Sequence, residues 1–146
     1  MKTPSLKTAG LSQGFRSGLE EEIAAELSEM GVPFRFEAKE DVIAYDKPAR
    51  VSKYTPDFVL QNGVIIETKG RFVTADRQKH LLIKSQHPTK DIRFLFNNPN
   101  SRISKQSPTT YAMWCEKHGF IYAKAATKPQ RKKGATSVPK EWIDAK

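Results

Sequence analysis

Residues 54–69 read YTPDFVLQNGVIIETK, and this stretch decides which fold we expect. Aromatic and β-branched residues lie on both sides of Asn62-Gly63, a dipeptide that is a strong signal for a tight hairpin turn. We therefore predict two strands, over 54–60 and 64–69, that pair with each other in an antiparallel hairpin.

The length of that turn decides which side chains share one face of the hairpin. A two-residue turn would place Asp57 opposite Thr68, with Glu67 on the other face. A three-residue loop that begins at Gln61 would instead set Asp57 opposite Glu67, with Gly63 in a left-handed backbone conformation. Glycine is the residue that this second register needs at the third loop position, because glycine reaches a positive φ without steric cost.

Asp57, Glu67 and Lys69 form the candidate site. Side chains two residues apart on a strand point to the same face, so Lys69 projects beside Glu67. Two carboxylates and an ammonium suit metal-dependent phosphodiester cleavage, because Mg²⁺ prefers oxygen ligands, acidifies a bound water and neutralises charge on the phosphate. Lys69 would orient or deprotonate the attacking water, or stabilise that charge. The alternative is an exposed hairpin with ordinary charges, since an E-x-K triplet by itself is common.

Helical and strand patterns alternate through the rest of the chain, which indicates an α/β layer fold. A capping box, S-x-x-E at 17–20, and the apolar spacing after it predict a helix over 18–30. A later helix is expected to start at an N-cap on Ser107, with Pro108 in its first position, and to end near His118. The remaining expected elements are a helix over 75–86 and strands at 32–36, 42–45, 92–96 and 120–122.

Charge is unevenly distributed over the 146 residues. The net charge is +9, but residues 20–46 carry −7 and residues 47–146 carry +13. A strongly basic segment is typical of proteins that bind nucleic acid, with a solvated basic face as the alternative.

No apolar run approaches the roughly 20 residues of a membrane span, and no signal peptide is visible. The single cysteine, Cys115, excludes an intrachain disulfide, so we expect a cytoplasmic protein.

Longer motifs make the chain resemble the phage endonuclease I family, the Holliday-junction resolvases of T-odd phages within the PD-(D/E)xK nuclease superfamily. The motifs that carry this resemblance are Phe15-Arg16-Ser17-Gly18-Leu19-Glu20, Tyr54-Thr55-Pro56-Asp57-Phe58, Asn62-Gly63, Glu67-Thr68-Lys69-Gly70, Lys79-His80-Leu81-Leu82-Ile83, Gln86-His87-Pro88, Ser107-Pro108-Thr109 and Cys115-Glu116-Lys117-His118-Gly119. They run in the family's order and cover most of the chain.

The resemblance implies a restriction-endonuclease-like mixed β-sheet flanked by helices, in a domain-swapped homodimer. It implies two divalent ions in each active site, Mg²⁺ with Mn²⁺ as an alternative, and no small-molecule cofactor. Branched DNA would be the partner, and no association with a membrane is expected. The implied catalytic residues are Glu20, Asp57, Glu67 and Lys69, and the implied metal ligands are Glu20, Asp57, Glu67 and Thr68. For Glu20 the alternative is the capping role, in which its carboxylate bonds back to the amide at the helix start.

We expect DNA contacts from Lys2, Lys7, Arg16, Arg71, Arg77, Lys79, His80, Lys84 and Arg102. One face of the expected helix carries Arg77, His80 and Lys84. These residues either contact phosphates or form a solvated face, and the sequence leaves both interpretations possible. We divide the chain into a flexible basic arm at 1–14, a nuclease domain at 15–123, a flexible basic linker at 124–140 and a short terminal helix at 141–146.

Residues 46–49 are expected to form an extended bridge, because Pro48 lacks an amide donor and pushes Lys47 towards extended geometry. A bridge that cannot fold back would hand the first helix to a partner, so that Glu20 of one chain completes the site of the other.

Two other functions fit the sequence. One is a PD-(D/E)xK nuclease with a restriction or repair target, and the other is a non-catalytic basic DNA-binding module.

Overall fold

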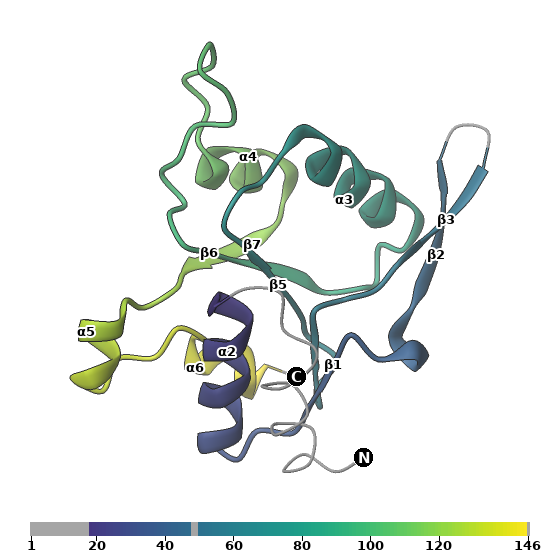
Figure 1. Ribbon diagram of the computed structural model, residues 1–146. Coiled ribbons are helices and arrows are strands. Elements are labelled where there is room, and N and C mark those ends of the chain that lie inside the picture. The colour runs from purple at the N-terminus through teal and green to yellow at the C-terminus, as the bar shows by residue number, and fades with distance from the viewer. Residues whose placement is uncertain (1–17, 48–49, 146) are drawn as a thin grey trace.

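The computed structural model describes residues 18–47 and 50–145 (Figure 1). In chain order its elements are α2 Gly18–Glu29, β1 Phe34–Phe36, the 3₁₀ helix η2 Lys39–Asp41, β2 Ile43–Lys47, β3 Arg50–Tyr54, β4 Phe58–Leu60, β5 Ile65–Lys69, α3 Thr74–Gln86, β6 Ile92–Phe96, α4 Tyr111–His118, β7 Ile121–Lys124, α5 Lys128–Lys132 and α6 Lys140–Asp144. The strands form a five-stranded sheet, with the order β1-β4-β5-β6-β7, and a separate hairpin of β2 and β3.

The five-stranded sheet is mixed. Antiparallel pairing joins β1, β4 and β5, whereas β5, β6 and β7 run parallel. Helices α3 and α4 connect the parallel strands, which need long crossover connections. Figure 1 shows α3 and α4 over one face of the sheet, with α2 and α6 on the opposite face. The expected α/β fold, a mixed sheet flanked by helices, is therefore confirmed.

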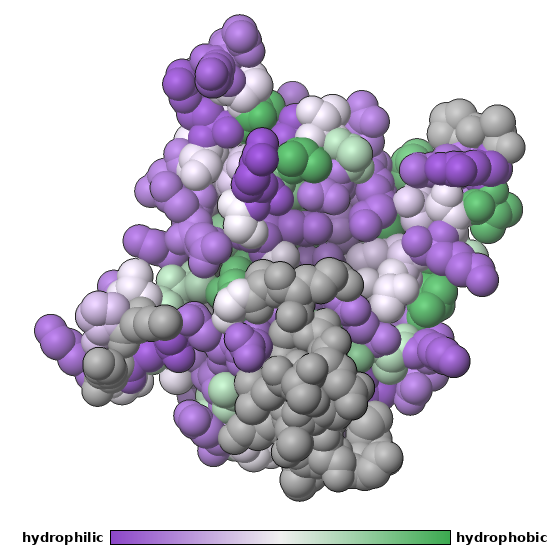
Figure 2. All heavy atoms as spheres, viewed as in Figure 1, coloured by the Kyte–Doolittle hydropathy of each residue, from purple (hydrophilic) through white to green (hydrophobic). Residues whose placement is uncertain are grey.

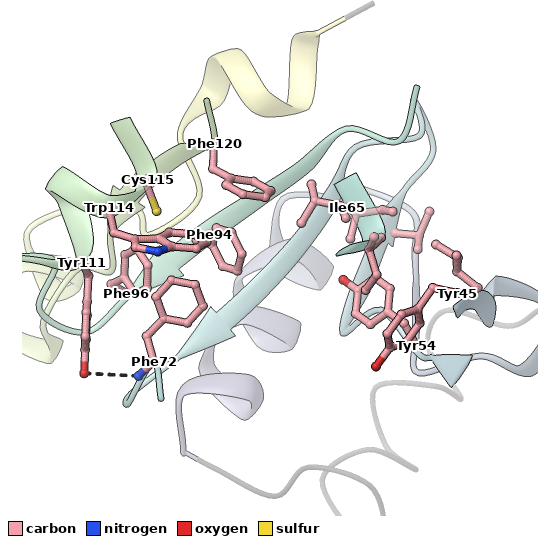
Figure 3. Packing of buried hydrophobic residues seen from close by; sticks show 14 residues of the cluster. Tyr45, Tyr54, Ile65, Phe72, Phe94, Phe96, Tyr111, Trp114, Cys115 and Phe120 are labelled. Carbon is pink, nitrogen blue, oxygen red and sulfur yellow. Dashed lines mark hydrogen bonds between the residues drawn. The ribbon is translucent and has the colours of Figure 1, made fainter. Parts of the chain in front are cut away.

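Two hydrophobic cores follow from the alternation of side chains along these strands. Ile65 and Phe94 join an aromatic cluster with residues of α3 and α4 (Figure 3). Their chain neighbours Ile66 and Leu95 point the other way and share a cluster with Ile23 of α2. Both faces of the central strands are covered, which explains why these strands read as continuous apolar runs.

The β4–β5 hairpin has the three-residue loop that we expected. Leu60 N donates a hydrogen bond to Val64 O at 2.9 Å, and Gly63 N donates to Leu60 O at 2.9 Å. Gly63 has a φ of 92°, a left-handed conformation that favours glycine. The strand register that results confirms the expected placement of Asp57 opposite Glu67.

The single strand expected over 54–60 was wrong. β3 ends at Tyr54 and β4 begins at Phe58, and these two strands belong to different sheets. Pro56 lies between them and has no amide hydrogen to give to a strand ladder. The chain therefore leaves the small hairpin and enters the large sheet at this point.

The helix expected from Ser107 begins later, at Tyr111. Thr110 is its N-cap, and Thr110 Oγ1 accepts a hydrogen bond from Met113 N at 3.1 Å. Thr110 also forms an isolated antiparallel bridge with Arg102, which holds the residues before the helix in an extended conformation. The prediction from Ser107 was wrong because Ser107 forms a local turn instead of a helix cap, and its Oγ accepts a hydrogen bond from Thr109 N at 3.1 Å.

Part of the segment 124–140, which we expected to be a flexible linker, packs against the rest of the protein. Helix α5 lies within this segment, and both Ser137 and Val138 are buried. Glu26 of α2 accepts hydrogen bonds from Ser137 N at 2.7 Å and from Val138 N at 2.8 Å. The expected short terminal helix is present as α6, and it buries Trp142.

The expected bridge at 46–49 lies only partly within the described residues. Lys47 pairs with Arg50 as β2 and β3 run antiparallel, so the idea of a bridge that cannot fold back was wrong. Figure 1 shows this β2–β3 hairpin extending away from the large sheet. The arm expected at 1–14 lies outside the described residues, and the four-part division of the chain stays a prediction.

The visible face of the molecule is mostly hydrophilic, with small apolar spots (Figure 2). Within the described part of the chain, no helix combines the length and the apolar character that crossing a bilayer requires.

Candidate active site

Asp57, directly before β4, and Glu67 of β5 are joined through backbone amides. Asp57 N donates a hydrogen bond to Glu67 Oε2 at 2.8 Å. Asp57 Oδ2 in turn accepts hydrogen bonds from Thr68 N at 3.0 Å and from Thr68 Oγ1 at 3.1 Å. Each carboxylate is thus fixed by the strand opposite, which is a direct consequence of the hairpin register.

Glu67 is only 2% exposed. Its Oε2 accepts a second hydrogen bond, from Tyr54 OH at 2.6 Å, while its Oε1 lies 3.8 Å from Lys69 Nζ. Burial and the nearby charge of Asp57 raise the pKa of Glu67 to about 8. A cation bound beside these carboxylates would favour their ionised forms, so the electrostatics of the site suit a metal ion.

Asp57 also belongs to a cluster with Glu20 and Glu37. One carboxylate oxygen from each of the three residues lies within 4.8 Å of the others. Glu20 and Asp57 are buried, and Glu37 is partly exposed. Asp57 therefore connects Glu20 with Glu67, and the donors are hard oxygen atoms of the kind that Mg²⁺ prefers.

The position of Glu20 bears on the two roles considered for it. Its carboxylate lies in the acidic cluster, at the first turn of α2. The capping alternative involves Ser17, which lies outside the described residues. The cluster favours the ligand role, which stays a prediction.

Glu37 is a candidate site residue that we did not predict from the sequence. It follows β1, and its amide donates to Asp57 O at 3.1 Å, which extends the β1–β4 pairing by one residue. Its φ of 45° is uncommon for a residue other than glycine. The available signal was one acidic residue after an alternating strand. Placing it beside Asp57 requires knowledge of the non-local pairing between β1 and β4.

Lys69 lies between two carboxylates at the end of β5. Its Nζ is 3.8 Å from Glu67 Oε1 and 3.6 Å from Asp76 Oδ2. Asp76 comes from the first turn of α3 and was also absent from the predicted site. This arrangement holds the Lys69 ammonium beside the carboxylates, where it can orient a water or stabilise charge on a phosphate.

Two of the expected DNA contacts on α3 face the protein interior. Arg77 is 9% exposed and donates from Nη1 to Phe72 O at 2.5 Å and from Nη2 to Thr74 Oγ1 at 3.0 Å. His80 is fully buried. The expectation that Arg77 and His80 contact phosphates was wrong, because this face of α3 packs onto the sheet instead of facing solvent.

The other described basic residues stay predicted DNA contacts. Arg71 and Arg102 are exposed, and Lys79 is partly exposed with its Nζ 5.3 Å from the centre of the Tyr54 ring. Lys84 is exposed and donates from Nζ to Gly119 O at 3.3 Å. The remaining candidates, which lie outside the described residues, are Lys2, Lys7 and Arg16.

The whole chain, residues 1–146, matches the family model for Phage endonuclease I. It is 48% identical over 111 residues to Endodeoxyribonuclease 1 of Enterobacteria phage T3, and this match covers 76% of the chain and 72% of the T3 protein. It is 43% identical over 129 residues to Endonuclease I of Escherichia phage T7, and this match covers 88% of the chain and 78% of the T7 protein. The resemblance found in the motifs is thereby confirmed.

Proposed function

The chain belongs to the phage endonuclease I family, and from this premise we propose that it is a Mg²⁺-dependent endodeoxyribonuclease that resolves four-way DNA junctions. The names of the T3 and T7 relatives support nuclease activity on DNA. The metal, the branched substrate and a homodimeric enzyme are the parts of the proposal that go further. The cytoplasm of an infected bacterial cell is the place of action that fits it.

The observation that carries this proposal is the interlocked pair of Asp57 and Glu67, with Lys69 beside it. Buried carboxylates are costly, because they lose hydration and repel each other. The raised pKa of Glu67 reflects that cost. Strongly perturbed carboxylates that converge in one place are typical of functional sites, and a divalent cation would offset their charge.

The residues of the site divide the work of phosphodiester hydrolysis. A divalent cation held by the carboxylates would neutralise the phosphate and acidify the attacking water. Glu20, Asp57 and Glu67, with Thr68, would hold two such ions, because Asp57 is shared between the acidic cluster and Glu67. Hydrogen bonds to these carboxylates fix them before the substrate arrives. Lys69 orients the water or stabilises the charge that develops on the phosphate.

The homodimer is proposed on symmetry. Two equivalent sites related by a two-fold axis would suit paired nicks across a junction that has the same symmetry. The basic surface would contact the DNA backbone, and such contacts carry no sequence information. Because these contacts are electrostatic, binding should weaken as salt is added. Structure selectivity would then come from how the two sites are spaced.

Nicking of a four-way junction and of a linear duplex with the same arms, in Mg²⁺ and in EDTA, tests the proposal. We expect junction cleavage in Mg²⁺, and in Mn²⁺, and none in EDTA. Equal cleavage of the linear duplex would point to a nuclease with another DNA target. Junction binding without cleavage in either metal would point to a non-catalytic DNA-binding module.

A further inference from the structure

His80 lies next to Glu67 but has no solvent contact. It comes from the middle of α3 and is 0% exposed. Its Nε2 is 3.9 Å from Glu67 Oε1. The rings of Tyr54 and Phe94 pack edge-on against the imidazole, with centroids at 5.1 Å and 4.9 Å, and the ring of Phe120 lies at 6.5 Å.

Both ring nitrogens of His80 lack a hydrogen-bond partner among the described residues. Burial, together with the charges of Lys69 and Lys79, lowers the pKa of His80 to about 2, so the imidazole is neutral and keeps one N–H. A buried donor without an acceptor is destabilising, because it has lost its hydrogen bond to water. An apolar side chain would fill the same aromatic surroundings without that cost, so packing alone does not account for a histidine here.

Glu67 Oε1 is an acceptor that lies close to this N–H. Its Oε2 is occupied by the donors Tyr54 OH and Asp57 N. Its Oε1 faces Lys69 Nζ at 3.8 Å and His80 Nε2 at 3.9 Å, and both contacts are longer than a hydrogen bond. A movement of about 1 Å would bring Nε2–H into hydrogen-bond range of Oε1.

We propose that His80 is a positioning residue for Glu67: a small shift lets its Nε2–H donate to Oε1, and this hydrogen bond holds the carboxylate in the orientation that a bound cation requires. This inference rests on the proposed metal-dependent function. Donors behind a ligating carboxylate orient it, and their removal typically weakens metal binding 10–100-fold.

The test compares His80→Leu, which removes the donor, with His80→Gln, whose amide can place an N–H near the position of Nε2. Calorimetric titration of the DNA-free protein with Mn²⁺ measures the metal affinity, and urea denaturation measures stability. We expect His80→Leu to bind Mn²⁺ at least 10-fold more weakly, without loss of stability, and His80→Gln to recover most of the affinity. Should His80→Leu fail to fold, His80→Met removes the donor with a more adaptable side chain.

Phe120→Leu is the matched control, because it alters the same aromatic surroundings without touching Glu67. It should lower stability and leave the Mn²⁺ affinity unchanged. Unchanged affinity in His80→Leu, or an equal loss in His80→Leu and His80→Gln, overturns the positioning role. Wild-type protein that binds no Mn²⁺ and cleaves no DNA would instead refute the proposed function, so the two failures are distinguishable.

Discussion

At the scale of single residues, the site is a group of carboxylates that the fold holds close together although they repel each other. Glu67 illustrates the balance. Tyr54 OH and Asp57 N donate to one of its oxygens, while burial and the charge of Asp57 keep its pKa high. The fold therefore fixes the positions of these carboxylates, as the proposed cation site requires.

Replacement of the carboxylates separates chemistry from binding. Asp57→Asn or Glu67→Gln should abolish junction cleavage, because each change removes a metal ligand. Junction binding should be retained, because each change also removes negative charge near the DNA. Lys69→Ala should lower cleavage by about 100-fold or more. Single-turnover nicking and gel-shift titration measure the two properties. Near wild-type cleavage by either carboxamide variant in Mg²⁺ would contradict the assigned metal site.

The raised pKa of Glu67 predicts how pH affects the metal-free protein. The folded state binds this proton more tightly than the unfolded state, since the pKa rises from 4.5 to about 8. The group's contribution to stability is therefore full below about pH 4.5 and is lost as the pH rises towards about 8. In EDTA, the free energy of unfolding of wild type should fall across this window more steeply than that of Glu67→Gln. If the free energies of unfolding of wild type and Glu67→Gln fall by the same amount across this window, Glu67 does not titrate in this way.

The sequence predicted part of this site. Asp57, Glu67 and Lys69 were predictable because a single hairpin with a short loop places them, and Gly63 selects its register. Glu37 and Asp76 were not, because each reaches the site from another element whose position depends on packing far along the chain. His80 was assigned to the wrong surroundings for a related reason. Helical spacing groups residues on one face but does not say whether that face meets water or the sheet.

At the scale of elements, local signals predicted strands and helices well where one pattern was unopposed, as in α2 and β6. They failed where a short segment changes partner. The stretch 54–60 looks continuous in sequence, yet its two ends pair with different strands. Basic, polar composition between 124 and 140 indicated a linker, but Ala125, Ser137 and Val138 are buried, and the amides of Ser137 and Val138 bond to Glu26 of α2.

The contact between the C-terminal segment and α2 depends on Glu26. Its two carboxylate oxygens accept hydrogen bonds from the amides of Ser137 and Val138. Glu26→Gln keeps the shape of the side chain but replaces one acceptor oxygen with an NH2 group, which cannot accept a hydrogen bond from the backbone amide opposite it. We therefore expect the free energy of unfolding to fall by about 1–3 kcal/mol. Glu29→Gln, at an exposed position of the same helix, is the control and should change stability by less than about 0.5 kcal/mol. Urea denaturation compares them, and equal stabilities would mean that the segment is held in another way.

At the scale of the whole molecule, the β2–β3 hairpin is the element on which the predicted exchange of Glu20 between chains depends. In the sequence it separates α2 and β1 from Asp57 and from Glu67 of β5. The hairpin is anchored to the end of α3, where Gln86 Nε2 donates to Asp46 O at 2.8 Å and His87 Nε2 lies 2.7 Å from Ala44 O. Within one chain, Glu20 lies beside Asp57. Opening the hairpin would carry Glu20 to a partner while preserving the same contacts, which is the usual route of domain swapping.

We therefore expect that, in the homodimer, each active site takes Glu20 from one chain and Asp57, Glu67 and Lys69 from the other. A mixed dimer of a Glu20→Ala chain with an Asp57→Asn chain tests this. If Glu20 acts in trans, both lesions fall in one site and the other site is wild type, so nicking of a four-way junction returns. If Glu20 acts in cis, as the folded-back hairpin allows, each site carries one lesion and the dimer is inactive. The two chains, co-expressed with different tags, are purified as the mixed dimer. Junction binding without nicking would then rule out the shared site, because it shows that the dimer is folded and still lacks an intact active site.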